Sequence, residues 1–220
     1  MLKKFLSYLI PIKIYTKTSE ISRTLEVTLS NGELVLDSKN TNYSYGSLQR
    51  ILRKGLQYIG FEKIKTFESI LLLGVAGGSV IKTLKEEINY KGKITGVELD
   101  PEIIEIANNY FNLDKTEGVT VIIDDAKKFV ANTNEKYDFI IIDIFQDKSM
   151  PEFLFESDFT ENIKSIVNNK GYILFNTMVL NRKDKERNKA YTELFDNSFQ
   201  VDSYPGLENY NEIFIIQKLK

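Results

Sequence analysis

The chain contains no cysteine and no histidine among its 220 residues. Without cysteine it has no disulfide framework, no thiol nucleophile and no thiolate metal site, and we expect no metal centre. Without histidine it lacks the side chain that most often transfers protons near neutral pH. Any general base must therefore be an aspartate, a glutamate, a tyrosine or a lysine.

A basic face and a long apolar run are also missing. The 29 Lys and Arg residues are offset by 31 Asp and Glu residues, for a net charge of −2, so there is no electrostatic footprint for nucleic acid. No segment approaches the roughly 18 apolar residues of a membrane span. The N-terminal stretch MLKKFLSYLIPIK is short, contains Pro11 and lacks a small-residue cleavage site. We interpret it as the first part of the fold, with a membrane anchor as the alternative, and expect a cytoplasmic protein without a membrane partner.

The composition, 42% hydrophobic and 27% charged, is typical of a globular chain with one main core. Residues 12–37 predict a small antiparallel sheet, with Asn31-Gly32 as a hairpin turn because both residues tolerate positive φ. A helix is predicted from Ser47, with Gly60 available as its stop. We therefore place an N-terminal β-hairpin region at residues 1–46, ahead of a main domain at residues 47–220.

From residue 69 onward, apolar strands alternate with helices. Asp100-Pro101-Glu102 is a strong helix start, with a cap, a proline and an acid in succession. The repeated order predicts an α/β fold with a Rossmann-like, doubly wound and mainly parallel sheet. The predicted buried strands are SILLLG, KITGVELD, VTVIID, DFIIIDIF and GYILFN. A polar helical stretch over residues 182–197 precedes FQVDSY and NEIFIIQK, whose short PGLEN link suits an antiparallel hairpin at the sheet edge.

The loop LLLGVAGGSV, residues 71–80, links the first of these strands to a helix. Gly74, Gly77 and Gly78 permit close approach of the backbone, and the helix start after Ser79 offers free N–H groups to a carboxylate or phosphate. Such a loop predicts a nucleotide-like ligand at the carboxyl edge of the sheet. A tight structural turn is the alternative interpretation.

Two acids at later strand ends extend the prediction. Glu98 ends the next strand about 20 residues after the loop, where an acid can accept both hydroxyls of a ribose; a solvated strand-end acid is the alternative. Asp125 is placed to accept from an adenine amino group while the N–H of Ala126 donates to a ring nitrogen, or to cap the following helix, and both roles can hold at once. The glycine loop and Glu98 fit either NAD or S-adenosylmethionine, and Asp125 favours the latter.

At this point the sequence resembles a known family. The segments LLLGVAGGSVIKTL, GVELDPEIIEIA, VIIDDAKKFV, YDFIIIDIF and GYILFN, in this order and spacing, are similar to the spermidine synthase branch of the class I S-adenosylmethionine-dependent transferases. LEVTLSNGELVLDS and NYSYGSLQRIL resemble that branch's leading hairpin and tyrosine-containing helix start, so the resemblance covers roughly residues 24 to 217. It implies S-adenosylmethionine or its decarboxylated form as cofactor, with Glu98 on the ribose and Asp125 on the adenine.

Aminopropyltransferases of this family carry two further carboxylates. One lies in the glycine loop and holds the amine of the decarboxylated cofactor; the other follows the fourth strand and deprotonates the attacking amine. Here Gly77 stands at the first position and Gln146 at the second. A loop carboxylate would repel the carboxylate of intact S-adenosylmethionine by several kcal/mol, on the order of 4 at an effective dielectric near 20. Glycine removes that repulsion, so we predict intact cofactor and methyl transfer.

The resemblance also supplies candidate catalytic residues. Asp143 ends the fourth strand beside the expected sulfonium, where it would orient the cofactor's amino group or the acceptor, or cap the following loop. Tyr45 matches the family tyrosine that lines the pocket. Asp147 would replace the missing base by a one-residue shift, which keeps aminopropyl transfer open. Phe145, Met150 and Phe153 form either an apolar acceptor wall or core packing.

Two other classes remain open: a catalytically inactive cofactor-binding module, and less favourably an NAD-dependent oxidoreductase. The latter would need a His, Cys or Tyr-x-x-x-Lys arrangement that the sequence lacks. No motif in the sequence identifies the acceptor. An acidic chain favours a small molecule or a protein over nucleic acid, and an exposed hairpin is compatible with a homodimer.

Overall fold

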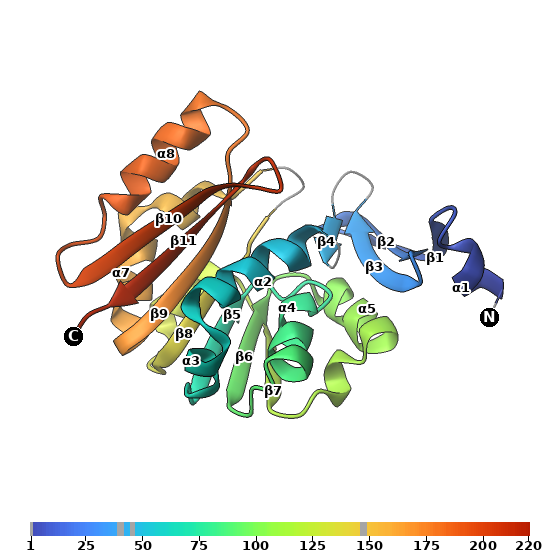
Figure 1. Cartoon of the computed structure of the whole chain (residues 1–220), viewed down its shortest axis with the longest axis horizontal. Helices are drawn as coiled ribbons and strands as arrows, with labels where there is room; N and C mark the ends of the chain where they lie inside the picture. Colours follow the sequence, from blue (N-terminus) through green and yellow to red (C-terminus); the bar gives the residue numbers. More distant parts are fainter. Residues whose placement is uncertain (1, 39–41, 45–46, 146–148) are drawn as a thin grey trace.

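The computed structural model describes residues 2–38, 42–44, 47–145 and 149–220. It contains two sheets (Figure 1): a seven-stranded sheet that forms the body, and a four-stranded sheet near the N-terminus. The predicted Tyr45, Gln146 and Asp147 lie outside the described residues.

The large sheet has the strand order β10-β11-β9-β8-β5-β6-β7. The five strands from β9 to β7 pair in parallel, whereas β11 pairs antiparallel with β9 and β10 with β11. The chain runs from β5 to β6 on one side and later to β8 on the other, so the winding direction reverses beside β5. The strands are β5 (Ser69–Leu73), β6 (Lys93–Glu98), β7 (Val119–Ile123), β8 (Tyr137–Ile142), β9 (Val167–Met178), β10 (Phe199–Leu207) and β11 (Asn211–Lys218).

Alternate residues of the central strands face opposite helical layers. Ile70 and Leu72 belong to a core shared with α2, α3, α4 and α5, whereas Leu71 and Leu73 belong to one shared with α6, α7 and α8. All four side chains are fully buried, which explains why this strand reads as a continuous apolar run. In Figure 1, α2 crosses in front of the sheet and α7 lies behind it. The doubly wound prediction is confirmed.

The helices between and around the strands follow the predicted order, with short additions. The helical apolar pattern after Gly78 continues from α4 into a π-helical segment, η1. In chain order the helices are α1 (Leu2–Leu6), α2 (Ser47–Ile59), α3 (Phe61–Lys65), α4 (Ser79–Lys82), η1 (Thr83–Glu87), α5 (Pro101–Phe111), η2 (Leu113–Lys115), α6 (Ala126–Asn132), η3 (Glu152–Phe155), α7 (Ser157–Ile166) and α8 (Arg182–Thr192). None of the helices in the described part of the chain has both the length and the apolar character needed to cross a bilayer.

The small sheet has the order β1-β2-β3-β4, all antiparallel. The hairpin turn at Asn31-Gly32 is confirmed, with φ angles of 50° and 78°. The strands are β1 (Ile12–Ser19), β2 (Arg23–Ser30), β3 (Glu33–Ser38) and β4 (Asn42–Ser44). Leu25, Val27 and Leu36 of this sheet form a third core with two residues of α5.

Three details differ from the sequence prediction. The predicted buried strand β7 is the edge strand of the sheet among the described residues, and its last residue, Ile123, is 48% exposed. The polar helix ends at Thr192, before the predicted 197, and β10 continues through Pro205 to Leu207, so the hairpin link is shorter than PGLEN. The helical pattern of α5 predicts a buried face of Ile103, Ile104, Ala107, Tyr110 and Phe111. The structure also buries Ile106, because α5 packs against both the large sheet and the small one.

Candidate functional site

Those predicted site residues that the structure describes lie at or just after four adjacent strand ends, on the carboxyl edge of the large sheet. Backbone hydrogen bonds hold these ends in register beyond the strands themselves. The Asp143 N–H donates to Leu73 O (2.9 Å), the Gly74 N–H to Val97 O (2.9 Å) and the Asp124 N–H to Glu98 O (3.0 Å). The ends of β8, β5, β6 and β7 are therefore fixed side by side, at the place where the winding reverses.

The glycine loop requires glycine for two different reasons. Gly74 has a φ of +89°, and a Cβ there would lie 2.2 Å from the carbonyl oxygen of Asp143, so only a hydrogen atom fits between β5 and β8. Gly78 has a φ of +78° and caps α4. Gly77 is buried in the same loop without a positive φ angle. The backbone geometry of the loop therefore depends on Gly74 and Gly78, whereas the φ angle at position 77 does not require glycine.

Glu98 holds the loop in place. One carboxylate oxygen accepts from the N–H groups of Val75 and Ala76 (3.0 Å each). The other accepts from the N–H groups of Leu99 (2.9 Å) and Asp100 (3.2 Å). Burial raises the pKa of Glu98, and these four hydrogen bonds oppose the rise. Glu98 is thus where the sequence placed it, with a structural task as a loop clamp that sequence reasoning missed.

Asp125 and Ala126 stand at the start of α6. The Asp125 carboxylate accepts from the Lys128 N–H (3.0 Å), which is the predicted capping role. Within the described part of the chain, the other carboxylate oxygen accepts no hydrogen bond. The Ala126 N–H belongs to the first turn of α6, where N–H groups have no partner inside the helix. The arrangement therefore leaves one acceptor and one donor available for an adenine edge.

Asp143 begins a chain of three side chains across the strand ends. Its carboxylate accepts from the Asn176 side-chain amide (2.9 Å), and the Asn176 oxygen accepts from the Asn211 amide (3.0 Å). Asn176 is fully buried and Asn211 is 6% exposed. Burial raises the pKa of Asp143 to about 6, against the lowering effect of the Asn176 hydrogen bond. We name this chain the Asp143–Asn176–Asn211 relay.

Sequence reasoning missed both asparagines of the relay. Asn176 closes GYILFN and Asn211 opens NEIFIIQK, so each marks the end of a strand that was predicted. Their contact depends on the antiparallel pairing of β9 with β11, in which Asn211 lies opposite Met178. No local pattern encodes that pairing.

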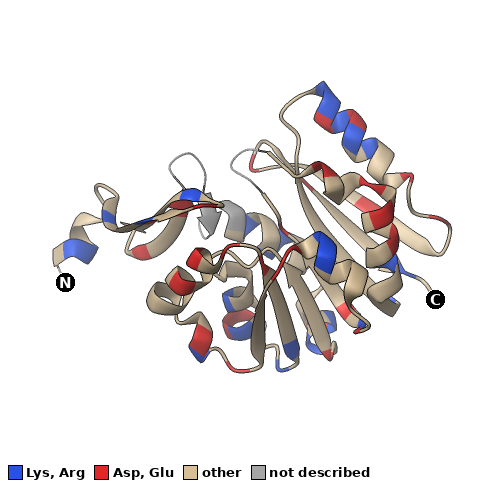
Figure 2. Cartoon of the chain, turned by 180° about the vertical axis from the view of Figure 1, so that it is seen from behind, with Lys and Arg blue, Asp and Glu red and all other residues tan. Residues whose placement is uncertain are grey.

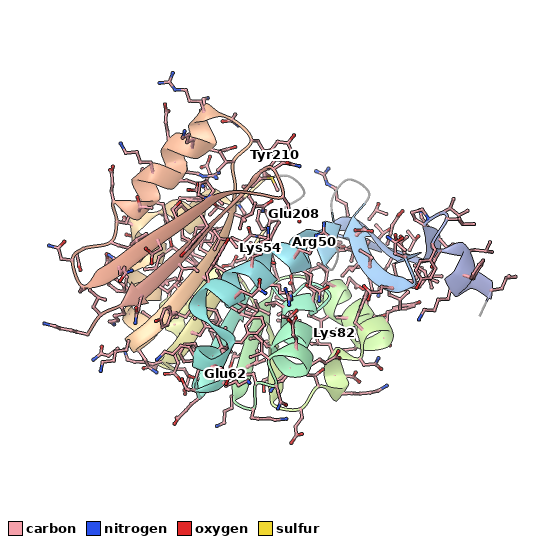
Figure 3. The ribbon with its side chains drawn as sticks, in the orientation of Figure 1. Arg50, Lys54, Glu62, Lys82, Glu208 and Tyr210 are labelled. Carbon is pink, nitrogen blue, oxygen red and sulfur yellow. The ribbon has the colours of Figure 1, made fainter. Side chains whose placement is uncertain are left out.

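The turn after β10 is tied to α2. Arg50 of α2 makes a bidentate contact with Glu208 (2.9 and 3.0 Å), and Figure 3 shows the two side chains meeting between the helix and the hairpin. The Val179 N–H also donates to Tyr210 O (2.7 Å). The start of β11, and with it Asn211, is therefore held from two sides.

The apolar residues after β8 divide between two roles. Phe145 and Phe153 pack against the core on the α7 side, and the Phe153 ring meets the Phe159 ring edge-on at 5.1 Å. Met150 belongs to the same core, accepts from the Met178 N–H through its sulfur (3.3 Å), and also lines a cavity of about 430 Å³ beside the start of α8. The two phenylalanines thus pack against this core, Met150 alone of the three lines this cavity, and the acceptor wall stays a prediction.

Comparison with known proteins identifies a family and several relatives. The family model described as the spermine/spermidine synthase domain matches residues 35–204. A polyamine aminopropyltransferase of Sulfolobus acidocaldarius is 38% identical over 116 residues, covering 47% of this chain and 36% of that protein. A polyamine aminopropyltransferase of Vibrio vulnificus is 29% identical over 131 residues, covering 58% and 44%.

Methyltransferases are also among the relatives. The eEF1A lysine and N-terminal methyltransferase homolog of Drosophila melanogaster is 29% identical over 155 residues, covering 66% of this chain and 23% of that protein. The matched segments thus span less than half the length of each of these three relatives.

Two solved structures share the fold. A probable spermidine synthase from Corynebacterium glutamicum superposes with a TM-score of 0.74 at 17% identity, covering 94% of this chain and 80% of that one. Human Methyltransferase-like protein 13 in complex with SAH superposes with a TM-score of 0.66 at 21% identity, covering 79% and 82%. The same fold therefore occurs in both kinds of transferase.

Proposed function

The chain belongs to the spermine/spermidine synthase family, and within that family we propose that it is an S-adenosylmethionine-dependent methyltransferase acting on a small molecule or a protein. The observation that carries the methyl-transfer proposal is the uncharged residue at position 77. Aminopropyltransferases of the family have a carboxylate there, and this chain has a buried glycine. Intact cofactor bears a carboxylate of its own, which a charged loop would repel.

The described residues suit such a cofactor. Because Gly74 has no Cβ, the backbone at the end of β5 lies close to the Asp143 carbonyl that follows β8. Asp125 and Ala126 offer an acceptor and a donor for the adenine. Glu98 would hold the ribose, whose hydroxyls would share its oxygens with the four backbone N–H groups that already donate to them.

Bound S-adenosylmethionine supplies a methyl group on a sulfonium, an activated leaving group, so orientation of the acceptor accounts for much of the catalysis. Asp143 contributes to that orientation. Since the pKa of Asp143 is about 6, its carboxylate is mainly anionic at neutral pH. It would then accept a hydrogen bond from a cationic amino group of the cofactor or of the acceptor. The relay holds that carboxylate in one orientation while the group binds.

Calorimetric titration of the unsubstituted chain with S-adenosylmethionine and with its decarboxylated form tests the proposal. We expect tighter binding of the intact cofactor. Gly77→Asp should weaken that binding at least tenfold, because like charges near 4 Å repel by about 4 kcal/mol at an effective dielectric of 20. Gly77→Asn is the matched control, since asparagine has nearly the same shape without the charge.

Equal losses in both variants would mean that size at position 77, rather than charge, limits binding, and would remove the main support for methyl transfer. Preference for the decarboxylated cofactor would favour aminopropyl transfer. That second function is supported by the aminopropyltransferases among the relatives. Binding of neither compound would contradict both transfer functions.

A further inference from the structure

The N-terminal segment, residues 2–10, exposes all six of its large apolar side chains. Leu2, Phe5 and Leu9 are 74%, 73% and 75% exposed, and Leu6, Tyr8 and Ile10 are exposed as well. The sequence analysis interpreted this stretch as the first part of the fold, with a membrane anchor as the alternative. In the structure α1 projects from the far end of the small sheet, away from the main body (Figure 1). An apolar cluster of this kind on a surface marks an interaction site.

The segment is nevertheless fixed to the sheet behind it. Ser7 is 2% exposed; its carbonyl accepts from the Asn31 N–H and its hydroxyl accepts from the Gly32 N–H (2.9 Å each). The same hydroxyl donates to the Lys4 carbonyl (2.7 Å). The hairpin turn therefore holds α1 and the residues after it as a platform, with the apolar side chains directed outward.

The segment from α1 through β1 carries charge of one sign. Residues 2–19 contain four lysines and no acid, in a chain whose net charge is −2. Lys13 pairs with Glu26, and Lys17 pairs with Glu105 (2.7 Å) and Glu102. Lys3 and Lys4 are exposed and have no ion-pair partner among the described residues. In Figure 2, α1 carries blue and neutral segments but no red.

From this combination we propose that residues 2–10 dock on the surface of an anionic phospholipid bilayer. Leucine, isoleucine, phenylalanine and tyrosine side chains enter the boundary between headgroups and acyl chains, while neighbouring lysines are attracted to anionic headgroups. A second copy of the chain fits less well, because two such platforms face to face would bring Lys3 and Lys4 of each copy together. The proposal concerns location and is independent of the reaction.

Flotation of the full chain with lipid vesicles tests this inference at low ionic strength. We expect binding to phosphatidylcholine vesicles that contain about one-third phosphatidylserine, and much weaker binding to pure phosphatidylcholine. The double variant Phe5→Ser/Leu9→Ser should reduce the bound fraction at least tenfold. Lys3→Glu/Lys4→Glu should remove the preference for the anionic vesicles. The control Ile21→Ser/Leu219→Ser alters two exposed apolar residues elsewhere and should bind as the unsubstituted chain does.

Each variant should fold, because none of the substituted side chains is buried. Circular dichroism melting verifies this. The inference is overturned if the unsubstituted chain stays unbound on anionic vesicles, or if Phe5→Ser/Leu9→Ser floats as well as the control. It is also overturned if sedimentation equilibrium shows a dimer that this double variant dissociates while no form binds vesicles. In that case a second copy covers the platform.

Discussion

At Gly74 a single hydrogen atom decides how closely two strands approach. A Cβ at this position would meet the Asp143 carbonyl oxygen at 2.2 Å, in a backbone conformation that already disfavours side chains. The tip of β5 and the residue that follows β8 are therefore adjacent only because residue 74 is glycine.

We expect Gly74→Ala to lower the free energy of unfolding by about 2–4 kcal/mol, from the positive φ angle and the steric overlap together. Gly206→Ala is a matched control, since Gly206 has a φ of +75° and a Cβ added there would meet no atom within 4 Å. It should cost only the φ contribution, about 1–2 kcal/mol. Urea unfolding measures both, and equal losses would contradict the overlap argument.

Asp143 makes stability depend on pH. Its pKa is about 6 in the folded protein, raised by burial from an ordinary value of 3.8. The folded state binds the proton of the Asp143 carboxyl more tightly than the unfolded state does, so this proton adds to the free energy of unfolding. The added stability is fully present below pH about 4 and is lost as the pH rises through about 6. The gap between the two pKa values corresponds to about 3 kcal/mol.

Asp143→Asn should therefore become more stable relative to the unsubstituted chain as the pH rises from about 4 to about 7, by up to about 3 kcal/mol. Urea unfolding of both proteins across this range measures the difference. Asp114→Asn, at an exposed position, serves as the control. A difference that stays constant with pH for Asp143→Asn would show that burial does not perturb this carboxyl.

At the scale of secondary structure, the relay joins three strand ends. Asp143 follows β8, Asn176 lies in β9 and Asn211 begins β11. The Asn176 amide is oriented from both sides, since it donates to Asp143 and accepts from Asn211. Antiparallel addition of β11 to the parallel sheet thus helps to fix a carboxylate two strands away.

Asn176→Leu should raise the pKa of Asp143 above about 6, because the amide hydrogen bond favours the charged carboxylate. The variant also leaves buried polar groups unpaired, at a cost of about 1–3 kcal/mol in unfolding free energy. Carbon NMR titration of the aspartate carboxyls measures the pKa. Asn211→Ala retains the bond to Asp143 and should produce a smaller rise. An unchanged Asp143 titration in Asn176→Leu would contradict the assigned role of the relay.

At the scale of the whole molecule, α5 connects the two sheets. Its Ile103 and Ile106 pack with Leu25, Val27 and Leu36 of the small sheet. Beside this core, the buried Ser19 hydroxyl donates to the Asp100 carboxylate at 2.5 Å, and Asp100 also caps α5. The start of α5 and the end of β1 therefore share one buried acid.

Ser19→Ala should lower the free energy of unfolding by about 1–3 kcal/mol, because it leaves a buried carboxylate oxygen without its donor and the N–H groups of Ile21 and Ser22 without their acceptor. Ser165→Ala removes an exposed serine hydroxyl that donates to a backbone carbonyl and should change stability by less than about 0.5 kcal/mol. Urea denaturation followed by circular dichroism compares the two. A loss at Ser19 no greater than at Ser165 would mean that this contact does not couple the sheets.

Much of the architecture was predictable because it has local periodicity. Three local patterns each predict a secondary structure, and the structure confirms all three. They are the apolar run at Ile70–Leu73, the Asn31-Gly32 turn and the cap at Asp100. Ile106 and Ile123 were misjudged for a non-local reason. Their burial depends on whether another sheet or strand covers them, and a helix or strand pattern does not say what lies outside it.

The candidate site divides in the same way. Sequence alone placed Gly74, Glu98, Asp125 and Asp143 at strand ends, because a strand followed by glycine or an acid can be recognised from consecutive residues. Tertiary structure alone decided that Glu98 clamps the glycine loop, that Asn176 and Asn211 hold Asp143, and that the large apolar side chains of residues 2–10 are exposed on the folded chain. The physical reason is that hydrogen-bond partners and burial depend on neighbours distant in the chain, whereas periodicity and turn chemistry depend on neighbours within a few residues.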